Sequence, residues 1–335
     1  PIEGAPLEPI AQLVDDPEVA VVMHAPSADL TLLAMAHGVR PANLEDVQLL
    51  AGFVGMGAGQ GLGALMSRVL DVSIDKGERY TDWSRRPLRE AQLDYAAADV
   101  ADLIELADEL WSRAEESGRA AWVREEIVRR FGPDTRWMPE PSRAWRKVKG
   151  QGRLNSRDRA TLAAVAEWRE RRAAAINRPA SWVVPDRTLI EIARRKPADV
   201  AALRRERGLP DQIKGAEAER LIDAVARGAS ADPIGMPAAP PSRVMARLDV
   251  LGPLSQVIIS ARANAEGIAP SLIATRDEIH NYLIARITGD GRESPLASGW
   301  RHAIAGSALD DLTDGRLSLT PLAEPPYLRE DRDVD

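Results

Sequence analysis

The chain has 335 residues, with 44 Lys and Arg against 51 Asp and Glu, four His and no Cys, for a formal net charge of −7. The absence of Cys excludes a disulfide framework, a thiolate metal site and a cysteine nucleophile, and the length predicts two or three domains. No apolar run approaches the roughly 18 residues that a membrane span needs, so we expect a cytoplasmic protein without a membrane partner; the oligomeric state stays open.

The first predicted elements are a helix over Leu7–Val14 and a short buried strand over Val19–His24. After the strand, Ser27 is expected to cap a helix that stops at Gly38. Asp29 then lies in the first helical turn, where the helix dipole favours a carboxylate by about 0.3–1 kcal/mol. Such an Asp is ordinary when it is considered alone.

Two features follow this helix. Asp46 either orients a metal ligand or caps a helix, and the residues around it leave both readings open. The glycine-rich stretch 55–63 has no Lys-Ser/Thr pair after it and no strand before it. A flexible loop is therefore favoured over a phosphate cradle.

An alanine-rich run containing Tyr95 and Asp99 predicts a helix from about Arg89 to Ser117. The spacing of four puts the phenol and the carboxylate on one helical face. A carboxylate can hold a divalent cation, and a neighbouring phenol can orient or deprotonate a water molecule. The alternative on spacing alone is an amphipathic helix with a half-buried tyrosine.

Charge is distributed unevenly along the chain. Residues 1–118 carry −13, residues 119–230 carry +11 and residues 231–335 carry −5. Residues 119–152 are interpreted as a basic connector, in which Trp122, Trp137 and Trp145 alternate with arginines. These tryptophans either stack on bases or pack the connector against its domains.

Residues 153–230 read as an all-helical bundle, in which Asn155 or Ser156 caps a helix that runs through Arg172. Its arginine-rich faces either contact phosphates or are merely solvated. The candidate nucleic-acid contacts are Arg153, Arg157, Arg169, Arg171 and Arg172.

A proline-rich linker over 231–241 follows. Residues 242–323 again predict helices, and the charged residues 324–335 are expected to be a disordered tail.

Short motifs in the first part of the chain resemble the ribonuclease D family. His24–Leu30 is similar to its second exonuclease motif, and Tyr95–Val100 is similar to its third motif, in the tyrosine branch of the DEDD exonucleases. Leu44–Ala51 and Asp75–Leu88 resemble the segments between them. Residues 153–230 resemble an HRDC domain, and residues 242–323 a second, more divergent one.

This resemblance implies an α/β ribonuclease-H-like exonuclease domain over 1–118, followed by two all-α HRDC-type helical bundles. It implies a 3′–5′ exoribonuclease that releases nucleoside 5′-monophosphates from RNA 3′ ends, with transfer-RNA precursors as substrates. In the family four carboxylates hold two divalent ions, Mg²⁺ or Mn²⁺; Asp29 and Asp99 would be two of those ligands, and Tyr95 would position or deprotonate the attacking water. His24 and Asp46 would lie next to these ligands and orient them.

One element of the family pattern is missing. The first motif, an Asp-x-Glu on the opening strand, would precede Pro1, so we expect an exonuclease domain that is incomplete at its N-terminus and has negligible activity alone. Two other readings are a non-catalytic RNA-binding protein that uses its HRDC-type modules, and a DNA-directed exonuclease of the same superfamily.

Overall fold

The computed structural model describes residues 8–74, 77–78, 80–133, 135, 140–235 and 240–332. The chain forms two compact units. Unit 1 contains the described residues up to 135 together with 240–332, and unit 2 contains residues 140–235. Leu7, Trp137 and the Asp75–Lys76 pair, which carried sequence expectations, lie outside the described residues.

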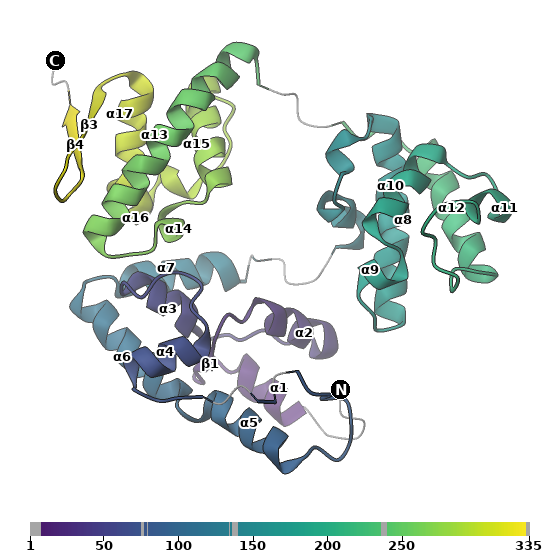
Figure 1. Ribbon diagram of the computed structural model, residues 1–335, viewed down its shortest axis with the longest axis horizontal. Coiled ribbons are helices and arrows are strands. Elements are labelled where there is room, and N and C mark those ends of the chain that lie inside the picture. Colours follow the sequence, from purple (N-terminus) through teal and green to yellow (C-terminus); the bar gives the residue numbers. More distant parts are fainter. Residues whose placement is uncertain are drawn as a thin grey trace. The chain divides into compact units, whose positions relative to one another are not determined.

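The N-terminal part of unit 1 contains a parallel two-stranded sheet and seven helices among the described residues (Figure 1). The strands pair in register from Val21 opposite Leu44 to Met23 opposite Asp46, so the predicted strand is present in shortened form. The elements are α1 (Glu8–Asp15), β1 (Val21–Met23), α2 (Ser27–His37), β2 (Leu44–Asp46), α3 (Val47–Phe53), α4 (Leu62–Val69), α5 (Glu90–Ala101), α6 (Leu103–Glu116) and α7 (Ala120–Phe131).

The long helix predicted through Ser117 is two helices. Asp102 ends α5 and begins α6, with φ −106° and ψ 13°, outside the helical region. The buried residues of α6, among them Leu106 and Leu110, lie in the core, whereas Gln92 is the buried residue of α5. The break therefore separates a core helix from a helix that lies mainly at the surface.

The C-terminal part of unit 1 shares one hydrophobic core with the N-terminal part. Trp300 contacts Phe53 edge-on at 5.5 Å between ring centroids and stacks on Trp122 at 5.1 Å. Its elements are α13 (Ser242–Glu266), α14 (Pro270–Ile273), α15 (Arg276–Thr288), η3 (Pro295–Ala297), α16 (Gly299–Arg301), η4 (His302–Gly306), α17 (Ser307–Asp314), β3 (Leu317–Pro321) and β4 (Leu328–Arg332).

Helix α13 is, within the described ranges, the one helix whose length and apolar composition would suffice to cross a membrane. The sequence expectation rested on uninterrupted apolar runs and did not include α13, because polar residues are interspersed along this helix. Its buried residues belong to the core of unit 1, including Leu248, Ile258 and Ile259.

The expected disordered tail over 324–335 is corrected by the structure as far as Arg332. Strand β4 pairs antiparallel with β3, with Leu319 opposite Glu330. Glu330 also accepts a hydrogen bond of 2.9 Å from Arg262 of α13. Cross-strand pairing and this ion pair order a segment whose charged composition suggested disorder.

The predicted connector over 119–152 is also corrected, because its residues belong to the two units. Its first part is α7, with Val123 in the core of unit 1, and its last part contributes Trp145 and Val148 to the core of unit 2. Of the connector tryptophans that the structure describes, Trp122 packs against the core of unit 1 and Trp145 lies in the core of unit 2. They therefore hold the segment against the two units and do not stack on bases.

Unit 2 is an all-helical bundle in which α8 and α12 lie against each other (Figure 1). Asn155 caps α8 as predicted, since its side chain accepts a hydrogen bond from the Asp158 N–H. Gly228 permits the close approach of α12, because a Cβ there would lie 2.6 Å from the Thr161 Cα. The elements are η1 (Pro141–Lys147), η2 (Gln151–Arg153), α8 (Ser156–Ala175), α9 (Ala180–Val183), α10 (Asp186–Arg195), α11 (Val200–Leu203) and α12 (Ala216–Ser230).

A buried carboxylate joins α7 to the C-terminal helices of unit 1. Glu126 is fully buried and pairs with Arg301, which is also buried. Arg129 donates two hydrogen bonds of 2.7 Å to the same carboxylate, and Arg130 donates another. Burial alone would raise the pKa of Glu126, but the three guanidiniums outweigh it and lower that pKa to about 2.

Replacing Glu126 by Gln should lower the free energy of unfolding by about 3–5 kcal/mol, because the buried Arg301 loses its buried partner and keeps only the exposed Glu125, at 3.8 Å. Lowering the pH should also destabilise the wild-type protein, because protonation removes the charge of Glu126. The folded pKa of Glu126 lies at about 2 and its ordinary value is 4.5, so the contribution is complete above pH 4.5 and is lost as the pH falls toward 2. Denaturant unfolding across this pH range measures both effects.

The matched control is Arg329→Met, which breaks the exposed pair between Arg329 and Asp331. It should change the free energy of unfolding by less than about 1 kcal/mol. If Glu126→Gln were as stable as this control, the buried ion pair would not be what joins the two parts of unit 1.

Candidate active site

The carboxyl ends of β1 and β2 meet at one edge of the sheet, a usual position for ligand sites in α/β folds. Ala25 follows β1 in a left-handed conformation, with φ +53°. Its N–H donates a hydrogen bond of 3.1 Å to Asp46 Oδ1 at the end of β2. The same oxygen accepts a hydrogen bond of 3.0 Å from the Gln48 N–H and so caps α3.

Asp46 is buried beneath this edge. Burial raises the pKa of Asp46, while hydrogen bonds from the backbone of Ala25, Gln48 and Leu49 and the charge of nearby His24 act in the opposite direction. Of the two readings that the sequence left open, the helix cap is present. The carboxylate also holds the turn that leads from β1 into α2.

The glycine-rich stretch 55–63 is tied to the same edge. Nε2 of His24 lies 2.8 Å from the Gln60 carbonyl oxygen, and the Gln48 side-chain amide donates to that oxygen at 3.0 Å. A carbonyl only accepts, so this His24 nitrogen carries a proton. These two contacts anchor a segment that the sequence suggested would be a flexible loop.

Asp29 lies in the first turn of α2, as expected, and is exposed. The predicted Ser27 cap is wrong: Pro26 occupies the N-cap position and no side chain caps the helix. Ser27 is already helical, and its carbonyl accepts a hydrogen bond of 2.9 Å from Thr31 Oγ1.

Tyr95 and Asp99 both lie on α5 and are both half-buried. The Tyr95 ring contacts the Trp83 ring at 6.0 Å between centroids. The start of α5 is held by Gln92, whose side chain donates to Thr81 Oγ1 at 3.0 Å. The spacing that puts phenol and carboxylate on one face is therefore realised on a helix with an anchored first turn.

Among the described residues, no group of three or more His, Asp or Glu side chains is placed to hold a metal ion. Asp29 and Asp99 lie on separate helices, α2 and α5, without a third donor beside them in this part of the chain. The described carboxylates therefore do not by themselves make a two-metal site.

The five predicted basic contacts in unit 2 have different environments. Arg153 and Arg157 are exposed. The prediction that Arg169 contacts nucleic acid is wrong, because this residue is buried. Its guanidinium donates hydrogen bonds to the Val184 carbonyl at 3.0 Å and to Asp186 at 2.7 Å. That guanidinium lowers the pKa of Asp186 against the opposing effect of burial, so Arg169 holds the bundle together instead of facing a ligand.

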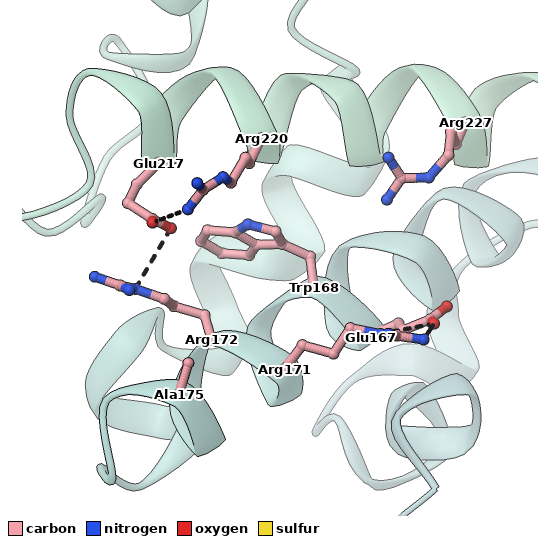
Figure 2. A pocket seen from close by; sticks show the side chains of 8 residues that line it. All are labelled: Glu167, Trp168, Arg171, Arg172, Ala175, Glu217, Arg220 and Arg227. Carbon is pink, nitrogen blue, oxygen red and sulfur yellow. Dashed lines mark hydrogen bonds and ion pairs between the residues drawn. The ribbon is translucent and has the colours of Figure 1, made fainter.

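Arg171 and Arg172 line a pocket between α8 and α12 (Figure 2), together with Trp168 and two arginines of α12 that the sequence analysis missed, Arg220 and Arg227. Arg220 and Arg227 could have been predicted to lie together, because a spacing of seven residues puts both on the same face of one helix.

The whole chain resembles known exonucleases. Residues 2–115 match the 3′–5′ exonuclease family, and residues 158–225 match the HRDC domain. The chain is 35% identical to ribonuclease D of Acidiphilium cryptum over 319 residues, covering 95% of this chain and 80% of that protein. It is 34% identical to ribonuclease D of Bartonella henselae, covering 93% of this chain and 76% of that protein.

A solved structure agrees with these relatives. The crystal structure of Escherichia coli RNase D, described as an exoribonuclease involved in structured RNA processing, superposes with a TM-score of 0.77 at 26% identity. The match covers 93% of this chain and 83% of that one. A protein from Bifidobacterium adolescentis, at 19% identity and a TM-score of 0.62, shares the fold.

Replacing Asp46 by Ala should lower the free energy of unfolding by about 1–3 kcal/mol, because the α3 cap and the partner of the Ala25 N–H are lost together. Asp46→Asn keeps an acceptor oxygen and should retain most of the stability. Denaturant unfolding in EDTA measures this contribution without any metal. Full stability of Asp46→Ala in EDTA would contradict the structural role of this carboxylate.

Proposed function

This chain belongs to the ribonuclease D family and is a 3′–5′ exoribonuclease; we propose that Asp29, Tyr95 and Asp99 form its reaction centre. The supporting observation is that the exonuclease match over residues 2–115 contains all three, in the motifs that the sequence analysis identified. We propose nucleoside 5′-monophosphates as the products and RNA 3′ ends, including those of transfer-RNA precursors, as the substrates.

In this proposal the protein supplies positioned oxygen atoms. Asp99 and Tyr95 stand one turn apart on α5, and the Tyr95 hydroxyl would orient the attacking water and accept or share its proton. Asp29 would contribute its carboxylate from the first turn of α2, whose N-terminus favours negative charge. His24 and Asp46 would act only by holding the turn that leads into α2.

Two divalent ions, Mg²⁺ or Mn²⁺, are the proposed cofactors, and their chemistry is to activate water and stabilise charge on the phosphate. The described donors do not by themselves complete a site for these ions. The rival reading is a non-catalytic RNA-binding protein that uses its HRDC-type modules. We further propose that residues 242–323 act as a second HRDC-like module, and that the protein works in the cytoplasm.

The proposal is tested in two forms of the protein. One is residues 1–335, and the other is a chimera that carries ahead of Pro1 the corresponding N-terminal segment of the Acidiphilium cryptum relative. The chimera should release 5′-mononucleotides from RNA with Mg²⁺ or Mn²⁺ and should be inactive in EDTA. Residues 1–335 alone should be far slower, because the described donors do not by themselves complete a metal site. Equal rates would show that no further ligands are needed, and an inactive chimera would favour the RNA-binding rival.

Within the active form, Tyr95→Phe should reduce turnover by about 10²–10⁴-fold, because it removes only the hydroxyl that handles the proton. Asp99→Asn and Asp29→Asn should cause losses at least as large, since each removes a charge but keeps the shape. The matched control is Asp94→Asn, on the same helix and exposed. Mononucleotide release under saturating metal is the measurement, and variants that keep more than about half of the wild-type turnover would overturn the assignment.

A further inference from the structure

Helix α5, which carries Tyr95 and Asp99, is not held by an apolar face among the described residues. None of its residues belongs to the hydrophobic cores of this part of the chain, and Gln92 is its one buried residue. Leu93 and Val100 are exposed at 54% and 61%. Because packing of an apolar face is what usually fixes a helix in place, the position of α5 depends on other contacts.

The segment 80–89, which precedes α5, supplies such contacts through the buried amide of Gln92. Nε2 of this side chain donates hydrogen bonds to Thr81 Oγ1 at 3.0 Å and to the Asp82 carbonyl at 3.4 Å. Its Oε1 accepts a hydrogen bond of 3.1 Å from the Arg89 N–H. A buried amide is costly without partners, so these bonds hold the first turn of α5 and the segment in one arrangement.

The carbonyl of Glu78 holds the indole that faces Tyr95. This oxygen accepts hydrogen bonds from the Thr81 N–H at 3.2 Å, from Thr81 Oγ1 at 2.8 Å and from Trp83 Nε1 at 3.2 Å. The Glu78 carboxylate pairs with Arg89, the residue before α5. The indole therefore has a fixed direction, because its one N–H donor is satisfied by a carbonyl close by in the sequence.

Trp83 lies against the phenol of Tyr95. The two ring centroids are 6.0 Å apart, and the ring planes are inclined at 56°. A tilted aromatic pair at this distance attracts beyond the area that it buries. Both side chains are half-buried, so loss of this contact would release the phenol and leave the core of unit 1 intact.

We propose that Trp83 is a positioning residue: held by the Glu78 carbonyl, it fixes the Tyr95 phenol where its hydroxyl reaches the attacking water. The inference rests on the proposed function, which gives that hydroxyl its role. It adds a separate requirement, because the phenol keeps its place only while the segment 80–89 keeps its hydrogen bonds. Displacement of a catalytic group by about 1 Å can cost about 100-fold in rate.

The first experiment measures RNA hydrolysis by the chimera. Trp83→Leu should reduce kcat by about tenfold or more and change KM by less than about twofold, because the groups that bind RNA stay in place. Trp83→Phe keeps a ring against the phenol and should retain at least about a third of the wild-type kcat. The matched control, Trp182→Leu, makes the same change at an exposed tryptophan of unit 2 and should leave kcat unchanged.

A double-mutant cycle separates positioning of Tyr95 from a general structural effect. In a Tyr95→Phe background the hydroxyl is already absent, so adding Trp83→Leu should lower kcat by less than about twofold. A loss in that background as large as in the wild type would overturn the inference, because Trp83 would then act through another group. Wild-type turnover in Tyr95→Phe alone would instead contradict the proposed function.

A second experiment needs no activity. Residues 1–335 are produced with 3-fluorotyrosine in place of their four tyrosines, and the ¹⁹F signal of Tyr95 is identified by its loss in Tyr95→Phe. In the folded protein this signal should be sharp and displaced from its position in urea, because the neighbouring indole holds the ring in one environment.

Thr81→Val keeps the indole but removes the hydroxyl that joins Gln92 to the Glu78 carbonyl. The Tyr95 signal should then broaden and move toward its position in urea. The matched control is Thr288→Val, which removes a hydroxyl that donates to a carbonyl of α15 at 2.8 Å and should leave the signal unchanged. A Tyr95 signal that is the same in Thr81→Val as in the wild type would overturn the inference, whether or not the chimera is active.

Discussion

The carboxylate of Glu126 is the point on which unit 1 depends. It comes from α7, which follows the residues that match the exonuclease family, and pairs with Arg301 from the C-terminal part. A charge of this kind is stable in a core only if it is fully paired, and here three guanidiniums surround it. The aromatic cluster of Phe53, Trp122 and Trp300 forms next to the same helices. The C-terminal helices are therefore a structural part of unit 1 and share its core.

The same principle, a buried polar group satisfied by long-range partners, explains what the sequence could and could not predict. Asn155 was identifiable as a cap because its acceptor role involves the next few residues. Arg169 was not identifiable as buried, since its partners include the Val184 carbonyl, which is distant in sequence. A run of arginines on one helix reads as a basic surface until the fold shows which of them turn inward. The end of α5 at Asp102 and the pairing of β4 with β3 were also missed.

The helical positions of the candidate catalytic residues were easier to predict than the contacts around them. The motif residues Asp29, Tyr95 and Asp99 lie on helices as expected, because helix propensity and a spacing of four are local properties. The contacts of Asp46 and His24 required the structure. Asp46 accepts from the Ala25 N–H and so links the ends of the two strands, whereas His24 contacts the Gln60 carbonyl in the glycine-rich segment. Charge is divided between the parts: the carboxylates proposed for catalysis lie in the acidic first segment, whereas unit 2 carries the excess of arginines. That division suits an enzyme that holds an RNA strand with one module and cleaves it with another.

The direction and chemistry of cleavage test this account most directly. An RNA labelled at its 5′ end, and a DNA of the same sequence, would be incubated with the chimeric protein and Mn²⁺, and the products resolved over time. The labelled RNA should shorten one nucleotide at a time from its 3′ end, each released product should be a nucleoside 5′-monophosphate, and the DNA should be cut far more slowly. Immediate release of a labelled mononucleotide, internal fragments, or equal cutting of the DNA would contradict it.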